Sequence, residues 1–235
     1  MAVSGIFLTR PGRQPDCSNA PVVRTVPLAP WTFHNEQDVC FKVTEELGQG
    51  AFGKVLGVTL GPHGNAAALK LLGRHPVRVD EDVHMHKEIQ ALTDLSHPCI
   101  VQLFGVVFTT FNVQLFLQRH EMSLHQYLAN GGPGGPTEAQ AKQTAVCILG
   151  GLAHMHAAGY VHRDLKPANI LVNCHPLVAV ISDLGSAHLG EDARDLATTL
   201  TVRAPEIMLG DAYRKACDIW SLGCIFAQVE QEALC

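Results

Sequence analysis

Short apolar segments alternate with glycine-rich and polar turns through the first half of the chain. Some alternate apolar and polar residues, as in Phe41-Lys42-Val43-Thr44, and others are continuously apolar but too short for a helix. Both patterns indicate β-strands with at least one buried face. The expected strands are residues 41–44, 55–60, 66–72, 105–108 and 112–117.

One helix is predicted among these strands, over residues 80–95. Met85, Ile89 and Leu92 recur at helical spacing, and three acidic residues lie in the first turn, where the helix dipole favours negative charge. Glu88 lies next to this apolar face.

The second half of the chain is mainly helical in pattern. Thr137 and Gln140 form a capping-box pattern, and Gly159 is suited to end the helix that follows. The expected elements are a short helix at 123–128, a long helix from 137 to about 156–158, buried strands at 170–172 and 177–181, and a hydrophobic core helix at 217–226. An α+β fold is therefore predicted, with a small β-rich part and a mainly helical part.

A polar cluster at residues 161–169 lies between two apolar runs. Asp164 can accept a proton from a hydroxyl, and Lys166 can neutralise charge on a phosphoryl group. Asn169 offers a carbonyl oxygen, which a hard cation such as Mg²⁺ prefers. The cluster is therefore a candidate site for phosphoryl transfer.

Three glycines, Gly48, Gly50 and Gly53, form a Gly-x-Gly-x-x-Gly pattern that lets the backbone approach phosphates. A dinucleotide-binding turn shares this pattern but opens a helix, whereas a strand is expected after Gly53. Lys54-Val55 stands where a Walker P-loop needs Lys-Ser/Thr. A glycine-rich hairpin over a nucleotide is therefore favoured.

Lys70 is the one charge in the apolar run 66–72. A buried lysine is costly without a partner, so it is either paired or an edge lysine whose head group reaches water. The residues alone leave both readings open.

Several motifs together resemble the eukaryotic protein kinases. His162-Arg163-Asp164-Leu165 with Asn169 is similar to their catalytic loop, and Lys166 is typical of the serine/threonine branch. Asp183-Leu184-Gly185 resembles the metal-binding turn, and Ala204-Pro205-Glu206 the end of the activation segment. The motifs occur in the family's order over about residues 41–233. Residues 203–210 and 218–226, with Ser186-Ala187, resemble the group of cyclin-dependent, MAP and glycogen-synthase kinases (the CMGC group).

The resemblance implies a bilobal fold. It assigns residues 41–117 to a small antiparallel β lobe, 118–120 to a hinge and 121–235 to part of a helical lobe. Since kinases continue with further helices after the one expected at 217–226, the large lobe is expected to be incomplete at its C-terminal end. Glu206 would then lack the family's arginine partner.

The resemblance also implies ATP and Mg²⁺ and a role for each site residue. Asp164, Lys166, Asn169, Lys70 and Glu88 would be catalytic, with Lys70 paired to Glu88 and Asn169 and Asp183 holding the metal. The residues expected to contact ATP are Leu47, Gly48, Gln49, Gly50, Ala51, Phe52, Gly53, Lys54, Val55, Ala68, Lys70, Gln118, Arg119, His120, Leu171 and Asp183, with Leu117 guarding the back of the site.

The activation segment implied by the resemblance runs from Asp183 to Glu206. Thr199 would contact Asp164 and Lys166, and Thr198 is the expected phosphorylation site, whose phosphate Arg163 would bind. Acids at 191, 192 or 195 are the alternative partners of Arg163. Asp218 would cap the backbone of the catalytic loop.

Three functions follow. The first is a protein serine/threonine kinase, with a regulatory protein partner at the Glu88 helix. The second is a kinase-like binding or scaffold module that truncation has inactivated, and the third a kinase of small molecules, against which the Ala-Pro-Glu motif argues.

Composition narrows the setting. A net charge of −5 gives no reason to expect nucleic-acid binding, and no apolar run reaches the roughly 18 residues that span a bilayer. Eight cysteines without Cys-x-x-Cys spacing indicate reduced, mostly buried thiols in the cytoplasm, with the nucleus also open. The proline-rich residues 1–40 predict a disordered extension, an organelle transit peptide being the alternative.

Overall fold

The computed structural model describes residues 40–50, 53–61, 63–73, 79–109, 112–130, 136–190 and 199–233. The predictions made for residues 1–39, for Ala51 and Phe52, for the acids at 191, 192 and 195, and for Thr198 lie outside these ranges.

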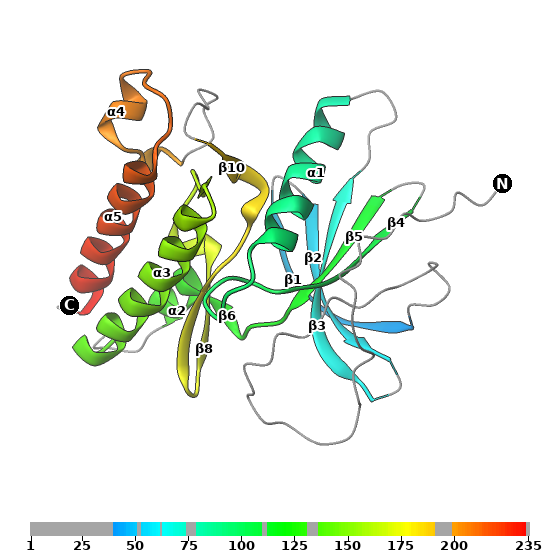
Figure 1. Ribbon diagram of the computed structural model, residues 1–235. Coiled ribbons are helices and arrows are strands. Elements are labelled where there is room, and N and C mark those ends of the chain that lie inside the picture. Colours follow the sequence, from blue (N-terminus) through cyan, green and yellow to red (C-terminus); the bar gives the residue numbers. More distant parts are fainter. Residues whose placement is uncertain are drawn as a thin grey trace. The chain divides into compact units, whose positions relative to one another are not determined.

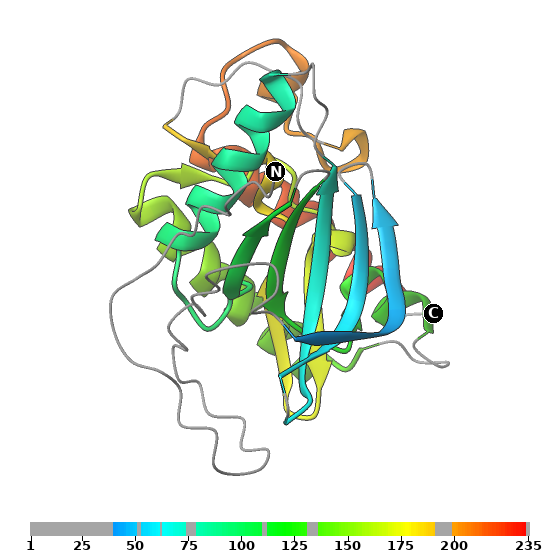
Figure 2. The ribbon, with the colours of Figure 1, turned by 90° about the vertical axis from the view of Figure 1, so that its right-hand side faces the viewer.

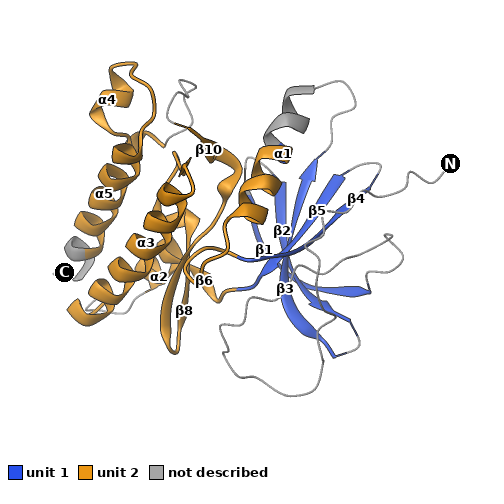
Figure 3. Cartoon of the chain, in the orientation of Figure 1, with its two compact units in different colours: residues 1–85, 102–119 blue, residues 86–101, 120–235 orange. Residues whose placement is uncertain are grey.

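The chain forms two compact units (Figure 3). The first consists of the described residues up to Met85 together with Gln102–Arg119, and the second of His86–Val101 with the described residues from His120 onward. Residues 86–101 fall in the second unit because Val101 N and Cys99 O hydrogen-bond with Ile181 at 2.8 and 2.9 Å. The predicted boundaries 41–117, 118–120 and 121–235 stay a prediction.

An antiparallel five-stranded sheet in the order β1-β2-β3-β5-β4 forms the first unit (Figures 1 and 2). All five strands predicted from the sequence are confirmed, and β1 extends through the first two glycines of the glycine-rich segment. The strands are β1 (Phe41–Gly50), β2 (Gly53–Leu60), β3 (Asn65–Gly73), β4 (Leu103–Phe108) and β5 (Asn112–Gln118).

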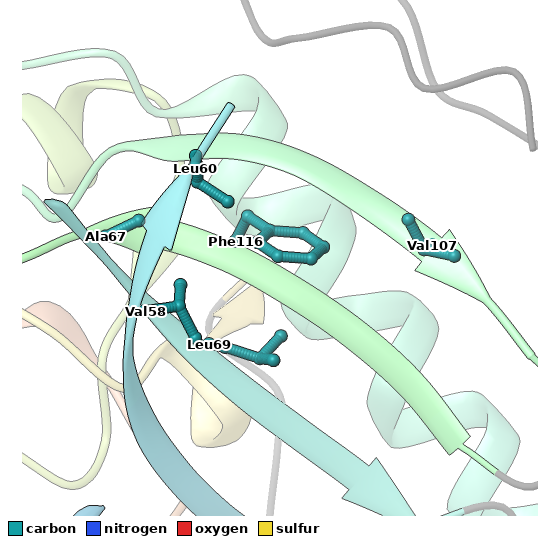
Figure 4. Close-up of a cluster of buried hydrophobic side chains, with 6 residues drawn as sticks. All are labelled: Val58, Leu60, Ala67, Leu69, Val107 and Phe116. Atoms are coloured by element: carbon teal, nitrogen blue, oxygen red, sulfur yellow. The ribbon is translucent and has the colours of Figure 1, made fainter. Parts of the chain in front are cut away.

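The two faces of this sheet differ in character. One face carries a buried apolar cluster contributed by β2, β3, β4 and β5 (Figure 4). Its members are Val58, Leu60, Ala67, Leu69, Val107 and Phe116. Lys70 directly follows Leu69 on β3, and successive side chains of a strand point to opposite faces, so Lys70 lies on the face away from this cluster. Val55 on β2 is directly opposite Lys70 and lies on the same face.

The predicted helix is confirmed as α1 (Val79–Asp94). Ile89 and Leu92 are buried as the apolar spacing predicted, and Glu88 beside them is buried too, at 3% exposed. A carboxylate this deeply enclosed differs from an ordinary surface glutamate and needs polar compensation.

The second unit contains the remaining helices, a three-stranded sheet in the order β6-β8-β9 and a two-stranded ladder of β7 with β10 (Figure 1). The predicted α+β class is thereby confirmed. The remaining helices and strands of the second unit are β6 (Met122–Ser123), α2 (Leu124–Asn130), α3 (Glu138–Ala157), β7 (Tyr160–Val161), β8 (Ile170–Cys174), β9 (Leu177–Ile181), β10 (His188–Leu189), α4 (Pro205–Met208) and α5 (Lys215–Ala233). Its 3₁₀ turns are η2 (Pro167–Asn169), η3 (Leu184–Ser186) and η4 (Leu200–Val202).

Both ends of α3 follow the sequence prediction. The Thr137 hydroxyl accepts from Gln140 N at 3.2 Å, and the Gln140 side chain accepts from Thr137 N at 2.8 Å, which completes the capping box. Gly159 adopts φ +83°, a left-handed conformation that side chains disfavour, just past the end of the helix.

The hydrophobic core helix predicted at residues 217–226 is confirmed for one side of α5 only. Cys217, Leu222 and Ile225 are buried, but Ile219 and Trp220 are 49% and 48% exposed. Helical geometry separates these two sets, because at roughly 3.6 residues per turn Cys217, Leu222 and Ile225 fall on one side of the helix and Ile219 and Trp220 fall on the other. The apolar composition of the segment concealed this division.

The prediction of mostly buried thiols is also only partly right. All six described cysteines are free, but only Cys147 and Cys217 are buried, while Cys40 is exposed and the other three are half-buried. Apolar neighbours in the sequence do not by themselves bury a cysteine, because a second helix or strand must also pack over its side chain.

We expect opposite effects from adding a methyl group at two neighbouring glycines of α3. A Cβ at Gly151 would lie 2.8 Å from Cys99 O and 2.9 Å from Ile181 Cδ1, whereas at Gly150 its nearest neighbour is His97 Cε1 at 3.5 Å. Gly151→Ala should lower the free energy of unfolding by about 1–3 kcal/mol. Gly150→Ala should raise it by about 0.5–1 kcal/mol, because alanine favours helix. Urea unfolding of both variants checks this; an equal gain at both positions would contradict the packing.

Candidate active site

The catalytic loop is anchored through its backbone to the buried carboxylate of Asp218 on α5. His162 N donates to Asp218 Oδ2 and Arg163 N to Oδ1, both at 2.9 Å. His156 Nε2 of α3 lies 2.8 Å from Oδ2. Asp218 is 1% exposed, so these contacts replace the water it has lost. The prediction that Asp218 caps the loop backbone is confirmed.

Arg163 adopts φ +69°, an uncommon conformation for a residue with a side chain. Such a conformation persists only where surrounding contacts over-determine it. Its N–H is held by Asp218, and its Nε donates to Ser186 O at 2.7 Å. The guanidinium carbon also lies 5.3 Å from the centre of the Tyr213 ring, a cation–π contact. Backbone and side chain of Arg163 are therefore both fixed.

The His162 ring links the loop to the end of β9. Asp164 N donates to His162 Nδ1 at 3.3 Å, so this nitrogen is an acceptor. His162 Nε2 lies 3.1 Å from Ser182 O and must carry the hydrogen. The ring is 0% exposed, and this tautomer satisfies both nitrogens. The loop and the Asp183 turn thus share a hydrogen-bonded frame.

Asp164 has both carboxylate oxygens engaged by donors. Oδ1 accepts from Thr199 N at 2.9 Å and from Thr199 Oγ1 at 2.7 Å. Oδ2 accepts from Lys166 Nζ at 2.6 Å and Asn169 Nδ2 at 3.2 Å. Lys166 Nζ also donates to Thr199 Oγ1 at 3.1 Å. The contact of Thr199 with Asp164 and Lys166, expected from the sequence, is confirmed in geometry.

Asn169 is oriented by the same network. Its Nδ2 donates to Asp164 O at 2.9 Å, so the amide nitrogen must point that way and the carbonyl oxygen stays available for another group. Its backbone oxygen accepts from both Ser182 N and Ser182 Oγ at 2.9 Å. Since Ser182 precedes Asp183, the two predicted metal ligands are brought to neighbouring positions.

Asp183 adopts φ +57°, the second positive φ at a residue with a side chain in the described part of the chain. Gly185 follows it two positions later. A Cβ at Gly185 would lie 3.5 Å from Asp183 Oδ1 and 3.4 Å from Glu88 Oε2. Two carboxylates thus flank this glycine, each at ordinary van der Waals distance from the position of a Cβ. Oxygen-rich surroundings of this kind suit a hard divalent cation.

The first unit contains most of the residues expected to hold the nucleotide. The glycine hairpin is confirmed, with Gly50 paired to Gly53 across the β1–β2 turn. Gly53 has φ +140°, and a Cβ there would lie 1.8 Å from Leu71 O, so only glycine fits. The fold of the sheet therefore requires this glycine, whatever its role toward phosphates. Leu47, Gly48 and Gln49 lie on β1 and Lys54 and Val55 on β2.

Lys70 lies on β3 and is buried, as is Ala68 two residues earlier. The edge-lysine reading is thereby excluded, because Lys70 is 8% exposed on an interior strand of the sheet. Its predicted partner Glu88 belongs to the second unit, and their pairing stays a prediction.

The expected hinge divides between the units. Gln118 ends β5, and its N–H donates to Gln102 O at 2.8 Å. Arg119 pairs with Glu45 of β1 at 2.7 Å. His120 begins the continuation of the second unit, and burial lowers its pKa to about 4, so the ring is neutral at physiological pH. Leu171 lies on β8, and Leu117 ends the buried run of β5.

Sequence reasoning missed three residues that support the site: His156, Ser182 and Tyr213. Each acts on the catalytic loop or the Asp183 turn through a contact with a residue distant in sequence. The sequence offered a signal for two of them, since His156 is a polar residue in the last turn of a helix whose middle is apolar, and Ser182 directly precedes Asp183. Tyr213 carried no local signal.

These features form a candidate phosphoryl-transfer site of the protein kinase type. The chain belongs to the protein kinase family: it matches the family described as "Protein kinase domain" over residues 41–234. The resemblance seen in the motifs is thereby confirmed. Among the described residues, no helix has both the length and the apolar character needed to cross a bilayer.

The relatives found include proteins named as cyclin-dependent kinases and one named as a mitogen-activated protein kinase. The chain is 32% identical to "Cyclin-dependent kinase C-2 C" of Arabidopsis thaliana over 80% of this chain and 30% of the relative. It is 36% identical to "Cell division control protein 2 homolog 3" of Trypanosoma brucei brucei, over 78% of this chain and 60% of the relative. "Cyclin-dependent kinase 4" of Mus musculus is 32% identical over 80% and 67%. The chain thus spans between 30% and 60% of the first two relatives' lengths.

Removal of the Asp218 carboxylate should destabilise the second unit strongly. Asp218→Ala leaves the buried N–H groups of His162 and Arg163 without acceptors, at a cost of about 3 kcal/mol in unfolding free energy. Asp218→Asn keeps one acceptor oxygen and should lose about half as much. Chemical denaturation measures both, with the exposed Asp211→Ala as control. Equal stability of the Ala variant and the control would refute this anchoring role.

Proposed function

We propose that this protein is an ATP-dependent protein serine/threonine kinase, which transfers the γ-phosphate of ATP to hydroxyl groups of protein substrates. The observation that carries the proposal is the Asp164 carboxylate, held on both oxygens by Thr199, Lys166 and Asn169. A carboxylate fixed in this way can orient an incoming hydroxyl and accept its proton. Membership of the protein kinase family supports the same reaction.

In the proposed reaction the substrate hydroxyl oxygen forms a bond to the γ-phosphorus, and the bond from that phosphorus to the bridging oxygen of ADP breaks. Asp164 takes the hydroxyl proton. Lys166, already bound to Asp164 at 2.6 Å, offsets negative charge on the group in transfer. Thr199 holds the carboxylate at the required angle. Positioning and electrostatics supply most of the rate in such a site.

We propose that Asn169 and Asp183 hold Mg²⁺. The Asn169 carbonyl oxygen and the Asp183 carboxylate are oxygen donors of the kind this cation takes, and Ser182 links their backbones. When bound, the metal would neutralise phosphate charge. The chain's own contribution is to keep the two oxygens oriented through the Asp164 and Ser182 hydrogen bonds.

We assign nucleotide binding to the glycine hairpin, to Lys70 with Glu88, and to backbone groups of residues 118–120. The hairpin geometry and the burial of Lys70 support this assignment. Phosphate oxygens are acceptors, and the backbone N–H groups of the hairpin and the Lys70 ammonium are donors.

Partners and location are part of the same proposal. Two of the relatives are named cyclin-dependent kinases, and a regulatory protein that binds α1 would act directly on Glu88, which lies on that helix. We propose such a partner beside protein substrates. We place the protein in the cytoplasm or nucleus, since six free cysteines fit a reducing compartment.

Asp164→Asn should abolish phosphate transfer to a generic protein substrate while ATP–Mg²⁺ still raises the melting temperature. The amide keeps the shape but cannot take the proton. Transfer by the wild type that disappears in the variant supports the kinase proposal. A thermal shift without any transfer by the wild type would favour a nucleotide-binding module instead. Transfer that survives in Asp164→Asn would reject this residue as the proton acceptor.

Thr199→Val should reduce kcat about tenfold to a hundredfold with little change in the KM for ATP. The variant loses the 2.7 Å bond to Asp164 and the 3.1 Å bond from Lys166, but keeps the size and backbone of threonine. Thr201→Val, at an exposed hydroxyl two residues on, is the matched control. Steady-state kinetics separates the two, and equal activity of both variants would argue against a catalytic role for Thr199.

A further inference from the structure

An ion pair in the first unit joins the end of β5 to β1 across two intervening strands. Arg119 Nη2 donates to Glu45 Oε1 at 2.7 Å, and the strand order β1-β2-β3-β5 sets β2 and β3 between them. The Arg119 side chain is 28% exposed and that of Glu45 is 53% exposed. The pair therefore lies at the border between the sheet and solvent.

Small residues make room for this pair. Gly57 on β2 is directly opposite Glu45 on β1 and Ala68 on β3. A Cβ at Gly57 would lie 3.0 Å from Arg119 Nη1 and 3.0 Å from Glu45 Cγ. The arginine and glutamate side chains thus occupy the space above Gly57. Because Gly57 has no positive φ, this close approach accounts for a glycine within a strand.

The register shows which face of the sheet carries the pair. Ala68, opposite Gly57, lies two residues from Lys70, and Val55 is opposite Lys70. Residues two apart on a strand share a face, so Gly57, Ala68, Val55 and Lys70 all lie on one side. This is the side to which we assign the nucleotide, opposite the apolar cluster of Figure 4.

β1 needs an anchor of this kind. It is one of the two edge strands of the sheet, paired with β2 alone, and its register is irregular between Val43 and Glu45 and again between Glu46 and Gly48. Such bulges interrupt the hydrogen-bonded ladder and bend a strand. Glu45 lies between the two irregularities, so its bond to Arg119 ties β1 down where its pairing is weakest.

We propose that the Arg119–Glu45 pair is a positioning element for nucleotide binding. By holding β1 toward the end of β5, it sets the height of Leu47 and the glycine hairpin above the base and ribose of ATP. The inference rests on the proposed function. The Arg119–Glu45 pair would affect the affinity for the nucleotide, whereas the transfer step at Asp164 does not depend on the pair.

The test compares two variants that disturb the pair differently. Glu45→Gln removes one charge, and Gly57→Ala changes no charge but inserts a methyl group only 3.0 Å from Arg119 Nη1 and from Glu45 Cγ. The atoms this methyl displaces belong to side chains, so the variant should fold. Each should weaken binding of a fluorescent ATP analogue about three- to fivefold, the range for a half-exposed ion pair. The KM for ATP should rise in parallel while kcat stays unchanged.

A charge reversal provides the decisive comparison. Glu45→Arg with Arg119→Glu in one chain should recover most of the affinity that Glu45→Arg alone loses, because the pair is rebuilt in reverse. Glu138→Gln, which breaks an exposed ion pair on α3, is the matched control for loss of one carboxylate.

Each outcome can be told apart. If the wild type binds the analogue and Glu45→Gln and Gly57→Ala bind it as tightly, the positioning role is overturned and the kinase proposal stands. Lack of rescue by the charge reversal also overturns it. If the wild type binds no nucleotide, both the positioning role and the kinase proposal are overturned.

Discussion

The geometry of the catalytic loop depends on one buried carboxylate. Asp218 accepts hydrogen bonds from His162 N and Arg163 N and contacts His156. A carboxylate that is almost completely enclosed cannot be satisfied by water, so α3, α5 and the loop must remain together to compensate it. This requirement holds Arg163 in its left-handed conformation. It thereby also sets the direction in which the side chain of the next residue, Asp164, points.

From this anchor the site extends by hydrogen bonds rather than by apolar packing. His162 joins the loop to Ser182, Ser182 joins Asn169 to the Asp183 turn, and Asp164 gathers the donors around it. Such a network has few ways of rearranging without leaving a buried polar group unsatisfied. It therefore suits a reaction in which positioning supplies most of the rate.

The motifs and most elements were predictable from sequence because their signals are local. The capping box of α3, Gly159 at its end and the strand periods each involve residues a few positions apart. The contacts of Thr199 with Asp164 and of Asp218 with the loop were predictable only by resemblance to a family. The division of α5 into a buried side and a half-exposed side was not predicted, because apolar composition does not say which face a neighbour covers.

The sequence by itself determined the class of fold, the order of the motifs and the residue types available for phosphoryl transfer. Only the tertiary structure decided which distant side chains meet: His156 with Asp218, Tyr213 with Arg163, and Arg119 with Glu45 over Gly57. The physical reason is that these contacts arise from register and packing between elements. Periodicity reports the face that a residue occupies, but not the partner that it finds there.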